Sequence, residues 1–390
     1  MDDKKVYGRL YSLVRAALTP LMKYKYDFET DYVPEMSEPF LFLSNHTTED
    51  DAFFSAIATR QPMYFVCADH LLRNKVYGKI FQYIINPIPV PKGGSTLTAV
   101  RKMLKRLRAG DNVYMCYEGK RSYHGETMPP SAALGALVKK AGCALVTYRV
   151  VGGYFTYPRW ARGNTRRGHV EGKVVGVYSS AELAKMSADE ITEIIRRDTY
   201  ENAYETQREK MWEYKGHDLA KGMDLVAFIC PNCGREDTIK TDGNNFYCTE
   251  CSLFGEYDNY GFLHGTDLKF DNLHSWMRWI ETEFDKRIKA HDDSPVYVAD
   301  AIELYTMDEN YKNHTVTVDR LTVYKDKFVI GGYEFSLSDV PFLSVLYGNV
   351  VLFTYNDIYY GLTAEDFKAW KCARLWHLIK GDTDDRTKEI

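Results

Sequence analysis

A histidine and an aspartate stand five residues apart after an apolar run near the start of the chain. The run Phe40–Ser44 predicts a buried strand, which places His46 at the end of that strand and Asp51 in the first turns of a helix expected over residues 49–59. A carboxylate bound to one ring nitrogen fixes the tautomer of an imidazole and makes its other nitrogen more basic. Such a pair can take a proton from a hydroxyl group. The same residues also fit a capped helix beside a surface histidine, so this motif alone leaves both interpretations open.

Two more loops that follow predicted strands carry cations. The block Glu118–Ser122 follows an apolar strand expected over residues 112–117, and Arg121 in this block supplies donors for an anion. Gly119 permits close approach of the backbone. Lys92 ends another apolar run. Because the carboxyl ends of strands in an α/β sheet meet at one edge, these cations and the histidine–aspartate pair are expected to form a site for a phosphorylated alcohol.

With these two motifs the sequence resembles the glycerolipid acyltransferases. The pair His46 and Asp51 matches their His-x4-Asp signature, and Glu118–Ser122 is similar to their Glu-Gly-Thr-Arg-Ser block at a similar spacing. The resemblance extends over roughly residues 5–210. It implies an O-acyltransferase that moves a fatty acyl group from acyl-CoA or acyl-carrier protein to a lysophospholipid such as 1-acyl-sn-glycerol 3-phosphate. The acceptor hydroxyl then attacks the thioester directly, without an acyl-enzyme.

The resemblance also implies a role for each motif residue. His46 is then the general base and Asp51 its partner. Four residues then form the acceptor site: Lys92 and Arg121 for its phosphate, Glu118 and Gly119 for the shape of its pocket.

Several positions depart from the family's pattern. Tyr117 replaces a proline, Lys120 a threonine and Lys92 an arginine, while Arg149 adds a cation where the family has none. These departures leave the type of reaction unchanged and leave open another lysolipid or a small polar molecule as acceptor. A second interpretation is a catalytically degenerate acyltransferase scaffold that acts as a zinc-ribbon protein-binding or regulatory module at the membrane.

Four cysteines form two Cys-x2-Cys pairs with fourteen residues between them: Cys230, Cys233, Cys248 and Cys251. In a cytoplasmic protein this pattern indicates a metal rather than disulfides. Four thiolates close a tetrahedral site, which predicts a structural Zn²⁺ in a segment that resembles a zinc ribbon. A rubredoxin-like iron site and a segment without metal are the alternatives. The flanks are acidic and poorly suited to a phosphate backbone, so no nucleic acid is expected as partner. The other four cysteines, Cys67, Cys116, Cys143 and Cys372, are expected to be buried thiols.

The order of predicted elements indicates an α/β fold with an acyltransferase-type mixed sheet flanked by helices. A helix is expected over residues 75–85 and a single polar helix over 187–214, followed after residue 302 by short alternating strands and a closing helix over 364–379. Three domains are predicted: an acyltransferase domain with an N-terminal amphipathic helix over 1–215, the zinc ribbon over 226–262, and a helix with an antiparallel, PH-like sheet over 265–390.

Charge and hydropathy point to a membrane surface as partner. The 390 residues are 45% apolar and 27% charged, which excludes wholesale disorder, and the formal net charge is −4. Between Lys92 and Lys173, however, 16 Lys or Arg face 4 Asp or Glu, a basic block suited to an anionic ligand or surface. The sequence shows neither a bilayer-spanning run nor a signal peptide, so a cytoplasmic protein at the inner face of the membrane is expected. The helix expected over residues 5–23 either packs on the protein's own core or lies on the membrane.

Overall fold

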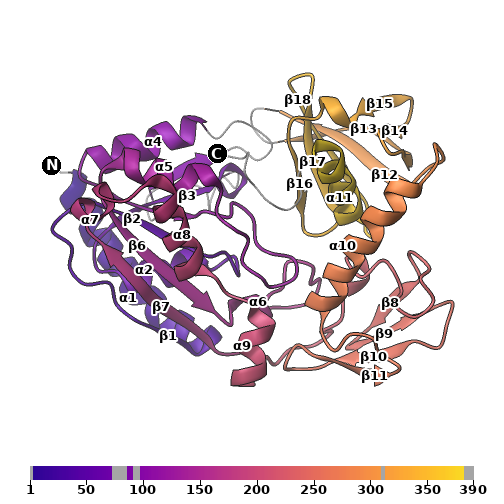
Figure 1. Cartoon of the computed structure of the whole chain (residues 1–390), viewed down its shortest axis with the longest axis horizontal. Coiled ribbons are helices and arrows are strands. Elements are labelled where there is room, and N and C mark those ends of the chain that lie inside the picture. Colours follow the sequence, from indigo (N-terminus) through magenta and orange to yellow (C-terminus); the bar gives the residue numbers. More distant parts are fainter. Residues whose placement is uncertain (1–2, 73–85, 91–96, 309–311, 382–390) are drawn as a thin grey trace.

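The computed structural model describes residues 3–72, 86–90, 97–308 and 312–381. Three sheets make up the described chain (Figure 1): a mixed sheet in the N-terminal half, a small sheet that carries the cysteines, and an antiparallel sheet near the C-terminus. The expected helix over 75–85 lies outside the described residues.

The N-terminal sheet has seven strands in the order β1 (Phe28–Thr30), β7 (Val170–Tyr178), β6 (Ala144–Val151), β2 (Phe40–Ser44), β5 (Asn112–Cys116), β3 (Met63–Ala68) and β4 (Pro87–Val90). Its five strands from β6 to β4 are parallel, and β7 runs antiparallel to β6. All five residues of β2 are buried, as expected of a central strand covered on both faces. The mixed α/β sheet predicted from the sequence is therefore confirmed.

Helices cover both faces of this sheet. Phe40 and Phe42 pack on one face with α1 (Asp3–Tyr26) and α2 (Asp51–Ala58). Leu41 and Leu43 point to the other face, which is covered by α4 (Leu97–Arg108), α5 (Ala132–Ala141) and α8 (Ala188–Thr199). Alternate residues of one strand thus belong to two separate cores, so β2 is held rigidly from both sides.

The helix α1 packs on the protein's own core and also keeps an apolar outer face. Tyr11 and Tyr26 are buried against the sheet, whereas Leu13 and Leu21 are 70% and 52% exposed. The helix over residues 5–23 is thereby confirmed, and it extends to Tyr26. Within the described ranges, none of the helices has the length and hydropathy needed to cross a bilayer.

The cysteine-rich segment forms a four-stranded antiparallel sheet in the order β11 (Leu263–Thr266), β10 (Phe254–Tyr257), β9 (Asn245–Cys248) and β8 (Ile239–Asp242). The long helix α10 (Leu273–Ala290) runs from this sheet toward the C-terminal sheet (Figure 1).

The C-terminal sheet has seven antiparallel strands in the order β15 (Tyr333–Ser336), β14 (Lys327–Ile330), β13 (Asn313–Val323), β12 (Tyr297–Met307), β18 (Ile358–Thr363), β17 (Val350–Tyr355) and β16 (Leu343–Leu346). Helix α11 (Ala369–Lys380) follows and packs on β16 and β17. One hydrophobic core runs through all of these parts and includes Tyr123, Trp160, Phe228, Trp276 and Trp370. The two C-terminal sheets are thus joined to the first half of the chain by a continuous apolar contact.

Short helices connect these elements: α6 (Gly153–Thr156), α7 (Ser180–Ala184), α9 (Ala203–Lys210) and the 3₁₀ turns Asp69–Leu72, Met223–Leu225 and Leu337–Asp339.

The single helix predicted over residues 187–214 is wrong, because the structure breaks it into α8 and α9. Arg149 donates hydrogen bonds from Nε to the carbonyl of Asp198 (2.9 Å) and from Nη2 to that of Arg197 (3.1 Å), which satisfies the C-terminal carbonyls of α8. Asn202 then caps α9 by accepting from the N–H groups of Tyr204 and Glu205. The cation that stood out at position 149 therefore ends a helix.

The strands differ from the sequence-based expectation in several places, and β1, β10 and β11 were not expected. Strand β7 was not foreseen because Gly172 and Gly176 interrupt its apolar pattern; a Cβ at Gly172 would lie 1.6 Å from Oη of Tyr148, so the sheet requires glycine there. Strand β16 was also missed. The two segments expected over residues 315–324 are parts of one strand, β13, which pairs with β12 through two register shifts.

Candidate active site and cysteine cluster

The register of the N-terminal sheet brings the two motif loops together. Strands β2 and β5 are parallel neighbours, with Ser44 opposite Cys116 at their carboxyl ends. His46 and Glu118 each follow two residues later, so they leave the sheet edge side by side. The main-chain N–H of His46 donates a 2.6 Å hydrogen bond to Oε1 of Glu118. Sequence reasoning placed both loops at one edge, and the register explains why they touch.

His46 and Asp51 form the expected pair. Nδ1 of His46 lies 2.8 Å from Oδ2 of Asp51, whose side chain is 1% exposed, while that of His46 is 25% exposed. The carboxylate also accepts hydrogen bonds from the N–H groups of Thr47 (2.6 Å) and Thr48 (3.0 Å) and from the Thr47 hydroxyl (2.8 Å). Because the carboxylate acts as acceptor toward the loop, it orients Nδ1–H of the ring and leaves Nε2 as the basic nitrogen.

Asn45 fixes the loop over residues 45–51, called the base loop below because it carries His46, the base expected from the sequence. Its side-chain amide donates to the carbonyl of Val150 (2.9 Å) and accepts from the N–H of the same residue (2.8 Å). Asn45 is fully buried, so these two hydrogen bonds between the end of β2 and the end of β6 replace a strand-to-strand contact. The base loop therefore has little freedom to move relative to the sheet.

Glu118 connects the base loop with the loop over residues 118–129. Besides the His46 N–H, it accepts the N–H of Met128 at Oε2 (2.8 Å), and it is 2% exposed. A buried carboxylate held by main-chain donors on two loops sets the distance between them. Gly119, by contrast, is exposed with φ +64°, and a Cβ there would meet no atom within 4 Å. The backbone at Gly119 is thus open to close approach, as expected.

Arg121 is held in place by partners that the sequence did not identify. Nη1 donates to the carbonyl of Tyr157 (2.9 Å), and Nη2 lies 3.1 Å from Oε1 of Glu49. The arginine side chain is 11% exposed and that of Glu49 is 61% exposed. The only sequence signal for Glu49 was its place inside the His-x4-Asp motif. Lys92, the second cation assigned to the acceptor's phosphate, lies outside the described residues.

Cys116 lies against the pair of His46 and Asp51. Its Sγ is within 4.8 Å of ligand atoms of both His46 and Asp51. Burial, and then the negative charge of Asp51, raise the pKa of the Cys116 thiol well above its ordinary value. The environment of Cys116 therefore favours its protonated thiol over the more nucleophilic thiolate.

The four cysteines of the two Cys-x2-Cys pairs lie together in the described structure. The Sγ atoms of Cys230 and Cys251 are 3.7 Å apart, and those of Cys233 and Cys248 are 3.8 Å apart. A tetrahedral site with Zn–S distances of about 2.3 Å requires S–S separations of about 3.8 Å. The quartet therefore has the dimensions of a four-thiolate metal site.

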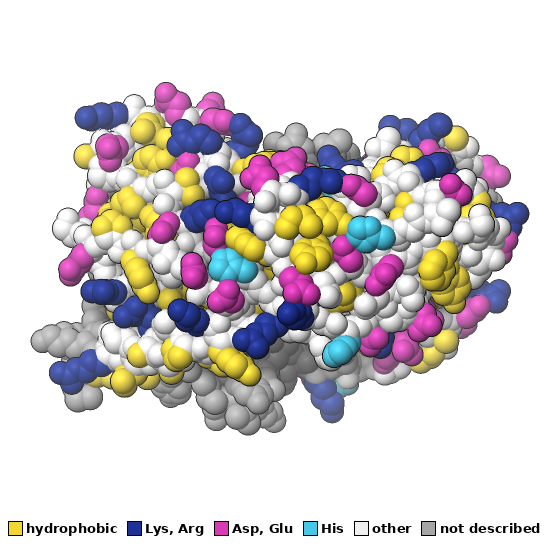
Figure 2. Space-filling model, turned by 90° about the horizontal axis from the view of Figure 1, so that it is seen from below, with side chains coloured by type: hydrophobic (Ala, Val, Ile, Leu, Met, Phe, Trp, Pro, Cys, Tyr) yellow, Lys and Arg dark blue, Asp and Glu magenta, His cyan; other side chains and the backbone are white. Residues whose placement is uncertain are grey.

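The thiols of this quartet differ in their pKa values. Burial raises the pKa of the Cys230 thiol to about 12. Burial also raises the pKa of the Cys248 thiol, but hydrogen bonds with Thr238 and with the N–H of Glu250 lower it to about 7. On the described part of the face in Figure 2, acidic and basic side chains are interspersed, and no continuous basic field of the kind that tracks nucleic acid is visible. Of the other cysteines, Cys143 and Cys372 are buried, whereas Cys67 and Cys116 are partly exposed.

Parts of this chain are similar to known acyltransferases. Residues 25–151 match the family model described as Acyltransferase. A curated relative, 1-acyl-sn-glycerol-3-phosphate acyltransferase of Streptococcus pneumoniae (strain ATCC BAA-255 / R6), is 23% identical over 229 residues, which are 58% of this chain and 81% of the relative. A solved structure, that of the 1-acyl-sn-glycerophosphate (LPA) acyltransferase PlsC from Thermotoga maritima, matches with a TM-score of 0.38 and 20% identity over 50% of this chain and 80% of the other.

The matched residues 25–151 contain both the pair of His46 and Asp51 and the block that carries Glu118 and Arg121. The family match and the curated relative together support an acyltransferase enzyme, similar to 1-acyl-sn-glycerol-3-phosphate acyltransferase, with both motifs in its matched part.

Proposed function

We propose that this chain transfers a fatty acyl group from acyl-CoA or acyl-carrier protein to the hydroxyl of a lysophospholipid such as 1-acyl-sn-glycerol 3-phosphate, with His46 as general base. The observation that carries the proposal is the 2.8 Å contact between Nδ1 of His46 and the buried carboxylate of Asp51, which leaves Nε2 available as the base. The similarity to a curated 1-acyl-sn-glycerol-3-phosphate acyltransferase supports the choice of acceptor.

In the proposed reaction, Nε2 of His46 takes the proton of the acceptor hydroxyl as its oxygen attacks the thioester carbonyl carbon. A C–O bond forms and the C–S bond breaks. The proton then passes from the imidazolium to the departing thiolate. Asp51 stabilises the imidazolium during this step because its carboxylate contacts Nδ1–H. Each turnover returns His46 to its neutral form.

The acceptor's phosphate is proposed to bind Arg121 together with Lys92. Arg121 already makes one bond to a main-chain carbonyl, that of Tyr157, which holds its guanidinium in one orientation. Its guanidinium also lies 5.7 Å from the centroid of the Tyr157 ring and pairs with the exposed side chain of Glu49, which can swing into solvent when a phosphate arrives. Gly119, two residues before this arginine, leaves room for the acceptor, because a Cβ there would meet no atom within 4 Å.

A structural zinc ion is proposed for Cys230, Cys233, Cys248 and Cys251, and with it a zinc ribbon over residues 226–262. The two S–S separations support it. All four donors are cysteines distant in sequence from His46, so the metal is proposed to stabilise the small sheet β8–β11 rather than to act in acyl transfer. The C-terminal sheet of seven antiparallel strands followed by α11 supports a PH-like domain within residues 265–390.

Peripheral binding to an anionic membrane is proposed through α1. Its outer face exposes Val6, Leu13, Leu21 and Tyr24, all at helical spacing, while the opposite side is held by the core. An apolar stripe on a helix already anchored to the protein can enter the headgroup region without unfolding anything.

The test of the proposed reaction is acyl transfer by the purified full-length chain, measured as thiol released from acyl-CoA with 1-acyl-sn-glycerol 3-phosphate as acceptor. His46→Ala should lower kcat by about 10²–10⁴-fold, the usual contribution of a positioned acid–base group. The matched control is His264→Ala, which removes an exposed histidine paired with Asp258 at 2.6 Å and should leave kcat unchanged. Wild-type turnover by a folded His46→Ala chain would remove His46 from the mechanism. A wild-type chain that acylates no lysolipid would favour the scaffold interpretation.

A further inference from the structure

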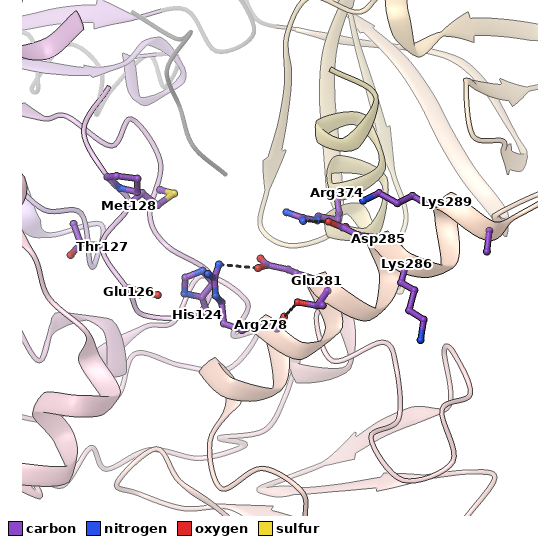
Figure 3. A pocket seen from close by; sticks show the side chains of 13 residues that line it. His124, Glu126, Thr127, Met128, Arg278, Glu281, Asp285, Lys286, Lys289 and Arg374 are labelled. Carbon is purple, nitrogen blue, oxygen red and sulfur yellow. Dashed lines mark hydrogen bonds and ion pairs between the residues drawn. The ribbon is translucent and has the colours of Figure 1, made fainter. Parts of the chain in front are cut away.

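A second group of metal-binding side chains lies where the loop over residues 118–129 meets α10. His124 and Glu126 come from that loop and His274 from the first turn of α10. One ligand atom of each lies within 4.8 Å of the other two. His124 and Glu126 also line a cavity of about 1020 Å³ between the loop and α10 (Figure 3). This group shares no residue with the cysteine quartet or with the proposed acyl-transfer residues.

Hydrogen bonds orient the side chains of Glu126 and His274 so that the atoms left to bind a metal face each other. Oε1 of Glu126 accepts a hydrogen bond from the hydroxyl of Tyr200 (3.2 Å). Nδ1 of His274 lies 3.2 Å from the carbonyl oxygen of His124 and donates to it. Oε2 of Glu126 and Nε2 of His274 are then left 3.8 Å apart. Histidines that bind metals through one nitrogen usually donate the other N–H to a carbonyl in this way.

The spacing of these atoms is closer to that of metal ligands than to that of a hydrogen bond. A separation of 3.8 Å is too long for a hydrogen bond between carboxylate and imidazole. Ligands at about 2.0–2.1 Å from a tetrahedral zinc ion lie about 3.3–3.4 Å from each other. A shift of about half an ångström would therefore bring Oε2 of Glu126 and Nε2 of His274 to the spacing of zinc ligands. The ring of His124 stands edge-on to that of His274, with the centroids 5.1 Å apart and an angle of 85° between the planes.

The ligand types, two imidazoles and one carboxylate, indicate which metal fits this group. Two imidazoles and one carboxylate form the ligand set of open, three-ligand zinc sites, in which the fourth position holds water. The side chains of Glu126 and His274 are 28% and 17% exposed, so the site is shielded but reachable through the adjoining cavity. Hard cations such as Mg²⁺ prefer oxygen donors, so two nitrogen donors disfavour them.

We propose that His124, Glu126 and His274 bind a zinc ion that fastens the loop over residues 118–129 to α10. The first two ligands follow Arg121 by three and five residues, and Glu118 at the start of the same loop contacts the base loop. The zinc ion thus restrains the loop that carries the proposed phosphate-binding arginine. Binding of the metal does not depend on the proposed acyl transfer, because it is measured without substrate.

The experiment measures zinc per chain by elemental analysis after dialysis of the full-length protein against a zinc buffer at fixed free Zn²⁺. His274→Gln and Glu126→Gln should each contain one zinc ion fewer per chain than the wild type, with all four cysteines intact. The matched control is His264→Gln, which alters an exposed histidine in β11 and should hold as much zinc as the wild type. Since the result is a difference, it does not depend on whether the cysteine quartet is loaded.

Two variants on different elements are used in case one of them fails to fold. If His274→Gln in α10 does not fold, Glu126→Gln still tests the site, because Glu126 lies on a loop and a glutamine there can keep the hydrogen bond from Tyr200. Zinc content equal to the wild type in either folded variant would overturn the three-ligand site. A milder change, Tyr200→Phe, should weaken the affinity for this zinc ion by about tenfold, the low end for loss of an orienting partner. Unchanged affinity in Tyr200→Phe would overturn the assignment of Tyr200 as the partner that orients Glu126.

Discussion

Replacing Glu49 by glutamine should release the guanidinium of Arg121 for the acceptor's phosphate. In the structure, Nη2 of Arg121 lies 3.1 Å from Oε1 of Glu49, so a phosphate must displace this carboxylate or share the arginine with it. Glu49→Gln removes the competing charge and keeps the size of the side chain. The bond from Arg121 to the carbonyl of Tyr157 (2.9 Å) remains and preserves the orientation of the guanidinium.

The magnitude follows from the exposure of the pair. The side chain of Glu49 is 61% exposed, so the pair belongs with surface ion pairs, which contribute about 0.2–1 kcal/mol. At about 1.4 kcal/mol per tenfold change, the KM for a phosphorylated acceptor should fall by a factor of about 1.4 to 5. The KM for the acyl thioester and kcat should stay at their wild-type values, and the effect should shrink as salt screens the pair.

The assay is steady-state acyl transfer with the acceptor varied at saturating thioester, in wild type, Glu49→Gln, Arg121→Ala and the double variant. Because the two residues are coupled, Glu49→Gln should have no effect on acceptor KM once Arg121 is gone. A matched control is Glu334→Gln, which removes an ion pair with Lys327 of the same length, 3.1 Å, on a glutamate that is 60% exposed. A rise in acceptor KM for Glu49→Gln, or an equal fall in the Arg121→Ala background, would refute the reasoning.

The remaining predictions concern the phosphate, the membrane and the metal. Arg121→Lys should raise acceptor KM almost as much as Arg121→Ala, because an ammonium cannot reproduce the planar fork of a guanidinium; wild-type KM with lysine would argue against a phosphate contact by that fork. Leu13→Gln with Leu21→Gln should weaken binding to anionic vesicles by about tenfold or more in a sedimentation assay, with wild-type affinity counting against docking through α1. Cys230→Ser with Cys248→Ser should release zinc and unfold the small sheet while acyl transfer survives in part; unchanged zinc content would exclude the quartet as its site.

The parts of the site that the sequence predicted are those set by the ends of strands. A strand such as Phe40–Ser44 can be recognised from its unbroken apolar run, and the residue that follows it must then lie at the sheet edge. His46, Asp51 and Glu118 could be placed in this way, without knowledge of their distances. The quartet of cysteines was equally visible, because two Cys-x2-Cys pairs separated by fourteen residues have a spacing typical of zinc ligands.

The parts that the sequence did not predict depend on contacts between side chains from distant segments. Glu49 and Arg121 are 72 residues apart, and neither position signals the other. Arg149 looked like an added cation of the site, yet its two bonds go to the carbonyls that end α8. Pairings of this kind follow from how loops and helices pack, which local periodicity does not encode.

The loop with Arg121 is held from two sides, and this links the C-terminal sheet to the proposed chemistry. On one side, Glu118 accepts N–H groups from the base loop and from Met128. On the other, the buried guanidinium of Arg159 donates to the carbonyl of Arg121 (2.8 Å) and to that of Val345 in β16 (2.7 Å). Removing β16 would take the carbonyl of Val345 away from the buried guanidinium of Arg159, which costs free energy. The hydrogen bond from Arg159 to the carbonyl of Arg121 would then be held less firmly. The C-terminal sheet therefore serves as part of the support on which the proposed phosphate-binding residue rests.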